Sequence, residues 1–77
     1  MDGNNLVRMA NHIADFFDSM PDRDEALTEF AAHLRKFWDP RMRAQILAMA
    51  HTPAAAELHA LVREALVRHG ESLAPAS

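Results

Sequence analysis

Residues 22–43, DRDEALTEFAAHLRKFWDPRMR, contain one complete helix pattern and the beginning of a second. The apolar residues of the first pattern recur every three or four positions, which places them on one face of an α-helix. They are Leu27, Phe30, Ala31, Leu34, Phe37 and Trp38. Asp22 is positioned to cap this helix, with Glu25 three residues later as its capping-box partner. We expect the helix to end before Asp39 and Pro40.

The Asp39-Pro40 pair predicts the start of another helix, because aspartate accepts hydrogen bonds from free amides and proline suits the first helical position. Its apolar positions are Met42, Ile46, Leu47, Met49 and Ala50. Thr52-Pro53 repeats the signature and opens a fourth segment, in which Leu58, Leu61, Val62, Ala65 and Leu66 form the stripe. Gly70 is the expected C-terminal stop.

Upstream, a first helix is predicted with Asn4 or Asn5 as its cap and Pro21 as its limit. Its stripe is Leu6, Met9, Ala10, Ile13, Phe16, Phe17 and Met20. No segment alternates with period two as a strand would. The sequence therefore predicts an all-α protein, a single-domain bundle of three to four short helices over residues 1–70, followed by a flexible tail at 71–77.

The composition limits the class of protein. A chain of 77 residues has room for one core, and 49% hydrophobic with 25% charged residues is typical of a globular domain. There is no cysteine, so disulfides and thiolate metal sites are excluded. The polar first five residues do not resemble a signal peptide and no apolar run reaches membrane-spanning length, so we expect a cytoplasmic protein without a membrane partner.

Charge is distributed unevenly along the chain, whose net charge is −3. Residues 15–29 contain six carboxylates and one arginine, whereas residues 35–43 contain Arg35, Lys36, Arg41 and Arg43 against Asp39 alone. Arginines in the first turns of a helix oppose its dipole, so local stability does not explain Arg41 and Arg43. Tryptophan and arginine are typical of interface hot spots, which predicts a docking patch around Trp38. The alternative, a core Trp38 beside solvated arginines, is left open by the sequence.

Chemical sites are not indicated. The five histidines match no metal-ligand signature, no nucleophile lies beside a base, and no glycine-rich phosphate loop is present. The acidic balance argues against nucleic-acid binding, although a helix-turn-helix module with the third helix as reader, or an independent helical adaptor, stays an alternative. A small enzyme is the least favoured interpretation.

Two stretches, LVRMANHIADFF at 6–17 and HLRKFWDPRMR at 33–43, resemble the delta subunit of bacterial NAD-dependent formate dehydrogenase. The likeness covers residues 6 to about 50, and only periodicity supports the last helix. The resemblance implies a non-catalytic accessory subunit that binds no cofactor itself. Its partner, the alpha (catalytic) subunit, would hold bis-molybdopterin guanine dinucleotide and iron-sulfur clusters within a complex that also carries flavin.

The resemblance and the docking patch coincide at one segment. We predict that the alpha subunit is contacted by Phe37, Trp38, Pro40, Arg41 and Arg43, with Arg35 beside them and with Arg8, Asn11 and Phe17 as secondary candidates. The predicted role is assembly, cofactor loading or stability of the enzyme. Because an exposed aromatic patch without its partner tends to bind another copy, self-association of the isolated chain is also expected.

Overall fold

The computed structural model describes residues 3–75, which form five α-helices, one 3-10 helix and no strand. The elements are α1 (Gly3–Phe17), α2 (Arg23–Phe37), α3 (Pro40–Met49), η1 (Pro53–Glu57), α4 (Ala60–Arg68) and α5 (Gly70–Leu73). The predicted all-α class is confirmed. None of the helices within this described part is long and apolar enough to cross a membrane.

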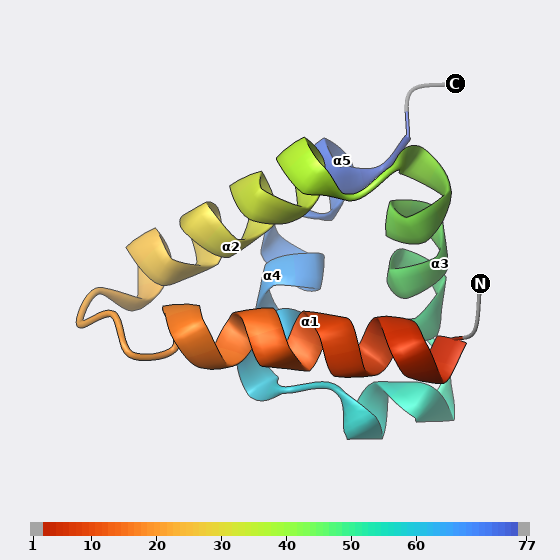
Figure 1. Ribbon diagram of the computed structural model, residues 1–77, viewed down its shortest axis with the longest axis horizontal. Coiled ribbons are helices and arrows are strands. Elements are labelled where there is room, and N and C mark those ends of the chain that lie inside the picture. The colour runs from red at the N-terminus through yellow and green to blue at the C-terminus, as the bar shows by residue number, and fades with distance from the viewer. Residues whose placement is uncertain (1–2, 76–77) are drawn as a thin grey trace.

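The helices form two layers around one core. α1 and α2 run in opposite directions on one side, joined by a turn, and α3 crosses between their far ends (Figure 1). α4 lies behind them and packs against both, while α5 packs against α2, α3 and α4. The α1–α2 pair therefore carries α4 on its inner side and leaves its outer side to solvent.

The core is built from the predicted stripes. Phe30 and Leu34 of α2 are fully buried in one core cluster that also contains Leu6 of α1 and Leu61 of α4. Burying a side chain of this size contributes about 1.5–3 kcal/mol to the free energy of folding. Small residues on α1, Ala10 and Ala14 among them, are also fully buried and allow the helices to approach closely.

Three predicted helix starts are confirmed by their caps. The Asp22 carboxylate accepts a hydrogen bond from the Glu25 backbone N–H at 3.2 Å, and Asp39 accepts from the Met42 N–H at 3.0 Å. Thr52 Oγ1 accepts from the Ala54 N–H at 3.2 Å. These side chains fix where α2, α3 and η1 begin, because each accepts a hydrogen bond from a backbone N–H that has no acceptor within its own helix.

The fourth predicted segment is divided in two. Thr52-Pro53 opens the short η1 rather than a long α-helix, and the chain becomes extended at Leu58, whose side chain is buried. A new helix, α4, then starts after His59, which caps it by accepting from the Leu61 N–H through Nδ1 at 3.0 Å. The break lets Leu58 reach the core, a tertiary requirement that the helical spacing did not reveal.

The predicted ends of the chain also need correction. α1 begins at Gly3, so Asn4 and Asn5 lie inside its first turn, and it ends at Phe17, before Pro21. Gly70 starts α5 instead of ending a helix, so residues 71–73 are not a flexible tail. The physical reason is Leu73, which is 0% exposed and anchors α5 in the core. Residues 76 and 77 of the predicted tail lie outside the described residues.

Candidate functional site

The junction of α2 and α3 is a sharp, well-supported corner. Trp38 ends α2 in an extended conformation, and its backbone N–H donates to the Leu34 carbonyl at 2.8 Å. Asp39 is also extended and caps α3, whose first residue is Pro40. Two consecutive extended residues between two helices turn the chain without leaving either helix end uncapped. The corner therefore holds its neighbouring side chains in defined positions.

The two aromatic residues of the corner take opposite sides. Trp38 is 5% exposed and belongs to the core, whereas Phe37 is 65% exposed. Of the two interpretations of Trp38 that the sequence left open, the structure therefore shows the core one. The prediction that Trp38 itself contacts a partner is corrected accordingly: it supports the corner from inside, and Phe37 is the aromatic side chain that a partner can reach.

The corner gathers cations that have no carboxylate partner within residues 3–75. Arg35, Lys36 and Arg41 are exposed, and Lys36 Nζ lies 5.6 Å from the centre of the Phe37 ring. Arg43 is half-buried, and its Nε is enclosed without a hydrogen-bond acceptor from the protein. An enclosed donor without an acceptor costs about 1–3 kcal/mol. A carboxylate or carbonyl oxygen that reaches Arg43 would remove that cost.

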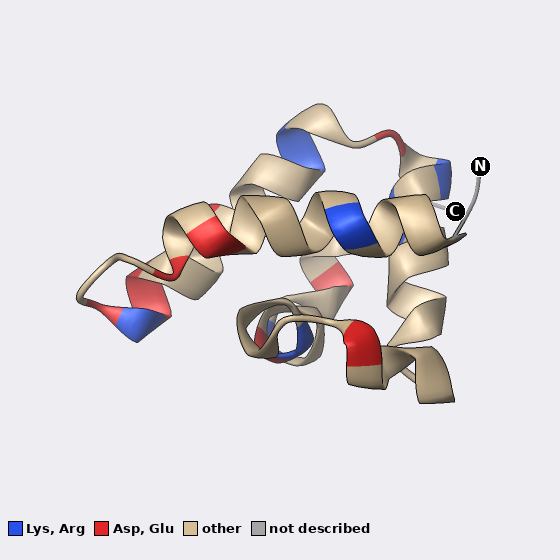
Figure 2. Cartoon of the chain, turned by 60° about the horizontal axis from the view of Figure 1, so that its bottom comes forward, with Lys and Arg blue, Asp and Glu red and all other residues tan. Residues whose placement is uncertain are grey.

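Carboxylates gather around the α1–α2 turn, which is the acidic end of the molecule (Figure 2). Unlike the cations of the corner, several of them form ion pairs within the protein. There Arg23 pairs with Asp18 at 2.7 Å and with Glu64 of α4 at 3.0 Å, and Arg68 of α4 pairs with Asp24. The hydrogen bond that Arg23 donates lowers the pKa of Glu64, and the bonds that Arg23 donates to the carboxylates of Glu64 and Asp18 raise its own pKa. These pairs join α4 to the turn, so part of the acidic end serves the fold.

The secondary candidates lie on α1, outside the corner. Arg8 is exposed and lines a shallow hollow with Met9 and Ile13. Asn11 has an internal role: its Nδ2 donates to the Glu57 carbonyl at 2.9 Å and its Oδ1 accepts from the His59 N–H at 2.8 Å. Both polar ends of the Asn11 amide thus hold α1 against the η1–α4 connection, a role that sequence reasoning did not predict.

Sequence reasoning also missed a row of rings that crosses from α1 to α2. Phe16 packs edge-on against Phe17 at 5.1 Å, Phe17 lies 6.0 Å from His33, and His33 lies 4.7 Å from Phe37, all measured between ring centres. We call Phe16, Phe17, His33 and Phe37 the aromatic seam. Phe16 is 73% exposed although its spacing assigned it to the core stripe. Adjacent helical residues differ by 100° in direction, so Phe16 and Phe17 do not have to share one face of α1.

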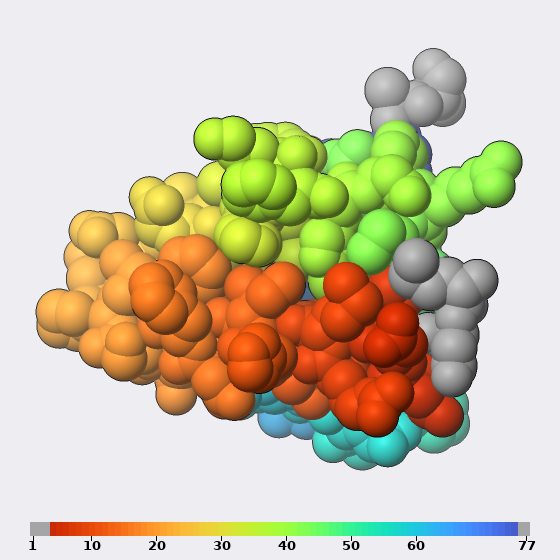
Figure 3. Space-filling view, in the orientation of Figure 1, coloured from red at the N-terminus to blue at the C-terminus, as the bar shows by residue number. Residues whose placement is uncertain are grey.

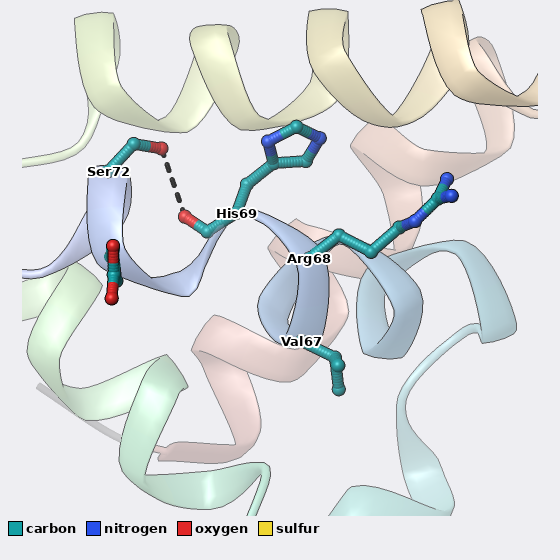
Figure 4. Close-up of a pocket in the computed structure, with 5 residues that line it drawn as sticks. Val67, Arg68, His69 and Ser72 are labelled. Atoms are coloured by element: carbon teal, nitrogen blue, oxygen red, sulfur yellow. Dashed lines mark hydrogen bonds between the residues drawn. The ribbon is translucent and has the colours of Figure 1, made fainter.

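A hollow at the α4–α5 connection offers no catalytic arrangement. Figure 4 shows the His69 ring directed away from Ser72, whose hydroxyl donates to the His69 backbone carbonyl at 2.9 Å. The serine is therefore not activated by the histidine, as a nucleophile–base pair would require. In the described chain, no group of three or more His, Cys, Asp or Glu side chains is placed to hold a metal ion.

Comparison with known families identifies the chain. The model of the NADH-dependent formate dehydrogenase delta subunit, FdsD, matches residues 5–66. The chain belongs to this family. The delta-subunit match runs from α1 into α4 and includes both the α2–α3 corner and the aromatic seam. No curated protein and no solved structure matches the chain.

Proposed function

We propose that this delta subunit is a non-catalytic, cytoplasmic accessory protein that binds the alpha subunit of an NADH-dependent formate dehydrogenase. Membership of the delta-subunit family supports association with that enzyme. Its role would be assembly, cofactor loading or stability. The molybdenum or tungsten cofactor, iron-sulfur clusters and flavin would then belong to the other subunits, since this chain has no cysteine with which to hold a cluster.

The α2–α3 corner is the proposed contact surface. The observation that carries this assignment is a set of unpaired cations around an exposed ring: Arg35, Arg41 and the half-buried Arg43 surround a corner from which Phe37 projects. A buried Trp38 and capped helix ends keep this corner rigid, so little conformational entropy is lost on binding. The complementary surface on the alpha subunit would be acidic around an apolar pocket.

The decisive experiment exchanges charge at two matched positions. Arg41 and Arg63 are both exposed arginines near the N-terminus of a helix, and neither pairs with a carboxylate in the described chain. We would co-express tagged Arg41→Glu, Arg63→Glu and the unchanged chain with the formate dehydrogenase subunits, then measure captured alpha subunit and formate-dependent NAD reduction. Both changes replace a cation by a carboxylate in the N-terminal half of a helix, so the helix dipole disfavours neither change and both variants should fold.

We expect Arg41→Glu to reduce capture about tenfold or more, as loss of a charged interface contact does, and Arg63→Glu to leave it unchanged. Equal capture by both variants would contradict the corner as the contact surface. Failure of the unchanged chain to capture any formate dehydrogenase subunit, with binding to DNA or unrelated proteins instead, would contradict the accessory-subunit function itself.

A further inference from the structure

The aromatic seam is a second surface feature, which adjoins the α2–α3 corner at Phe37. It lies between α1 and α2, the two helices that meet along the front of the molecule in Figure 3. Phe16 and Phe37, at its two ends, are 73% and 65% exposed, which is unusual for large apolar side chains on a chain of this size. Exposed apolar groups that are contiguous rather than scattered indicate an interaction surface. The neighbouring charges indicate what covers it.

A shallow hollow on the seam has one charge of each sign at its rim. It is lined by Phe17, Glu29, Ala32, His33, Lys36 and Phe37. Glu29 and Lys36 are seven residues apart on α2, which is close to two turns, so they share a face of the helix about 10 Å apart. The midpoint between them lies between Ala32, a small residue, and His33. Neither Glu29 nor Lys36 forms an ion pair inside residues 3–75.

This arrangement is complementary to itself. A twofold axis that passes between Ala32 and His33 exchanges the two ends of the α2 face, so Glu29 of one copy meets Lys36 of the other twice. The same rotation brings the basic end of one seam toward the acidic end of the other (Figure 2). An interface between identical subunits related by a twofold axis needs this self-complementarity. The helix dipole also favours Glu29 before Lys36, but it gives no reason for the exposed rings of Phe16 and Phe37 beside them.

We propose that the aromatic seam binds a second copy of this chain, in a twofold dimer in which α2 packs antiparallel to its counterpart with Ala32 and His33 at the centre. Phe16 and Phe37 become covered, and two Glu29–Lys36 pairs flank the centre. Ala32 is a small residue beside the axis, which favours a close approach of the two helices. Phe37 and Lys36 are shared with the α2–α3 corner, whereas Phe16 and Glu29 belong to the seam alone, so variants at Phe16 and Glu29 distinguish the dimer from the docking function.

A charge-swap series tests the proposal by sedimentation equilibrium on the full-length chain. Lys36→Glu and Glu29→Lys each place like charges together at two symmetric positions, so each should raise the dimer dissociation constant about tenfold. The double variant restores opposite charges across the axis and should return the constant to near its original value. Arg63→Glu is the matched control, since Arg63 lines a hollow that contains none of the seam residues, and it should change nothing.

Three outcomes would overturn the twofold dimer. One is a chain that stays monomeric up to roughly 1 mM, the concentration that corresponds to the weakest specific affinities. Another is a double variant as weak as the single ones, which would exclude the antiparallel pairing. The third is a monomeric chain in which Phe16→Ser reduces capture of formate dehydrogenase, because the seam would then belong to the partner enzyme. Phe16, Glu29 and Lys36 are exposed, so their variants should fold, and circular dichroism of each variant checks this.

Discussion

Replacing each of the two adjacent aromatic residues of the corner by alanine should have opposite consequences. Trp38 is 5% exposed, and truncation of a buried tryptophan to alanine costs about 3–5 kcal/mol through lost burial and the cavity left behind. A chain of 77 residues has a total unfolding free energy of about 4–12 kcal/mol. Trp38→Ala should therefore remove about a quarter or more of the stability and bring the domain closer to unfolding.

Phe37→Ala removes a ring that is 65% exposed in the isolated chain, so its cost should stay below about 1 kcal/mol. The measurement is urea denaturation followed by circular dichroism for both variants, with capture of the alpha subunit measured in parallel at a temperature where both are folded. Phe37→Ala should lose capture while keeping stability.

The interpretation would be refuted by the reverse pattern. If Trp38→Ala unfolds at nearly the original urea concentration, Trp38 does not support the core. If Phe37→Ala captures the alpha subunit normally, the exposed ring is not part of the contact. A Trp38→Phe variant, which keeps an aromatic side chain in the core, should lose less stability than Trp38→Ala and keep capture, so that a binding defect can be separated from unfolding.

Three further predictions concern the fold. Asn11→Ala removes the hydrogen bonds to the Glu57 carbonyl and the His59 N–H, so urea denaturation should show a loss of about 0.5–1.5 kcal/mol for each bond, and Asn11→Asp should also lose stability, because a carboxylate cannot donate to the Glu57 carbonyl. Leu73→Ala should cost about 2–5 kcal/mol by the same assay, because the side chain is fully buried; an unchanged midpoint would mean that α5 is dispensable. The pKa of Glu64 is lowered mainly by its hydrogen bond from Arg23, so its stabilising effect is present above the ordinary carboxyl pKa and lost as the pH falls through the lowered one. Glu64→Gln should therefore flatten the dependence of stability on pH at the acidic end of the titration, and an identical slope in both proteins would contradict the link.

Local chemistry accounts for the parts of the fold that the sequence predicted correctly. The caps at Asp22, Asp39 and Thr52 act within three residues of their partners, so their effect is visible in the sequence itself. The break at Leu58 and the docking of Leu73 depend on where the core lies, which no local pattern specifies. Periodicity predicted the buried stripes, but it could not decide whether a residue at the edge of a stripe, such as Phe16, is buried or exposed.

The same distinction applies to the candidate site. The cluster of cations at the α2–α3 corner could be predicted, because residues 35–43 contain four basic residues and one carboxylate, and this excess of positive charge is visible in the sequence. The opposite orientations of Phe37 and Trp38 were not, since they follow from two extended residues that turn the chain after α2. The internal hydrogen bonds of Asn11 could not be predicted, because its partners at 57 and 59 are distant in sequence and close only after folding.

The two proposed surfaces share Phe37, and this makes them thermodynamically linked. If one ring is covered in the twofold dimer, it is not available to the alpha subunit, so binding of the enzyme must separate the two copies. Only the monomeric fraction of the chain can then bind the enzyme, so the apparent affinity for the enzyme is reduced in proportion to that fraction. Glu29→Lys, which disfavours the dimer and lies outside the α2–α3 corner, should strengthen apparent capture at high concentration and leave it unchanged at low concentration, where the chain is already monomeric. A capture affinity that is equal in both regimes would show that the two surfaces do not compete.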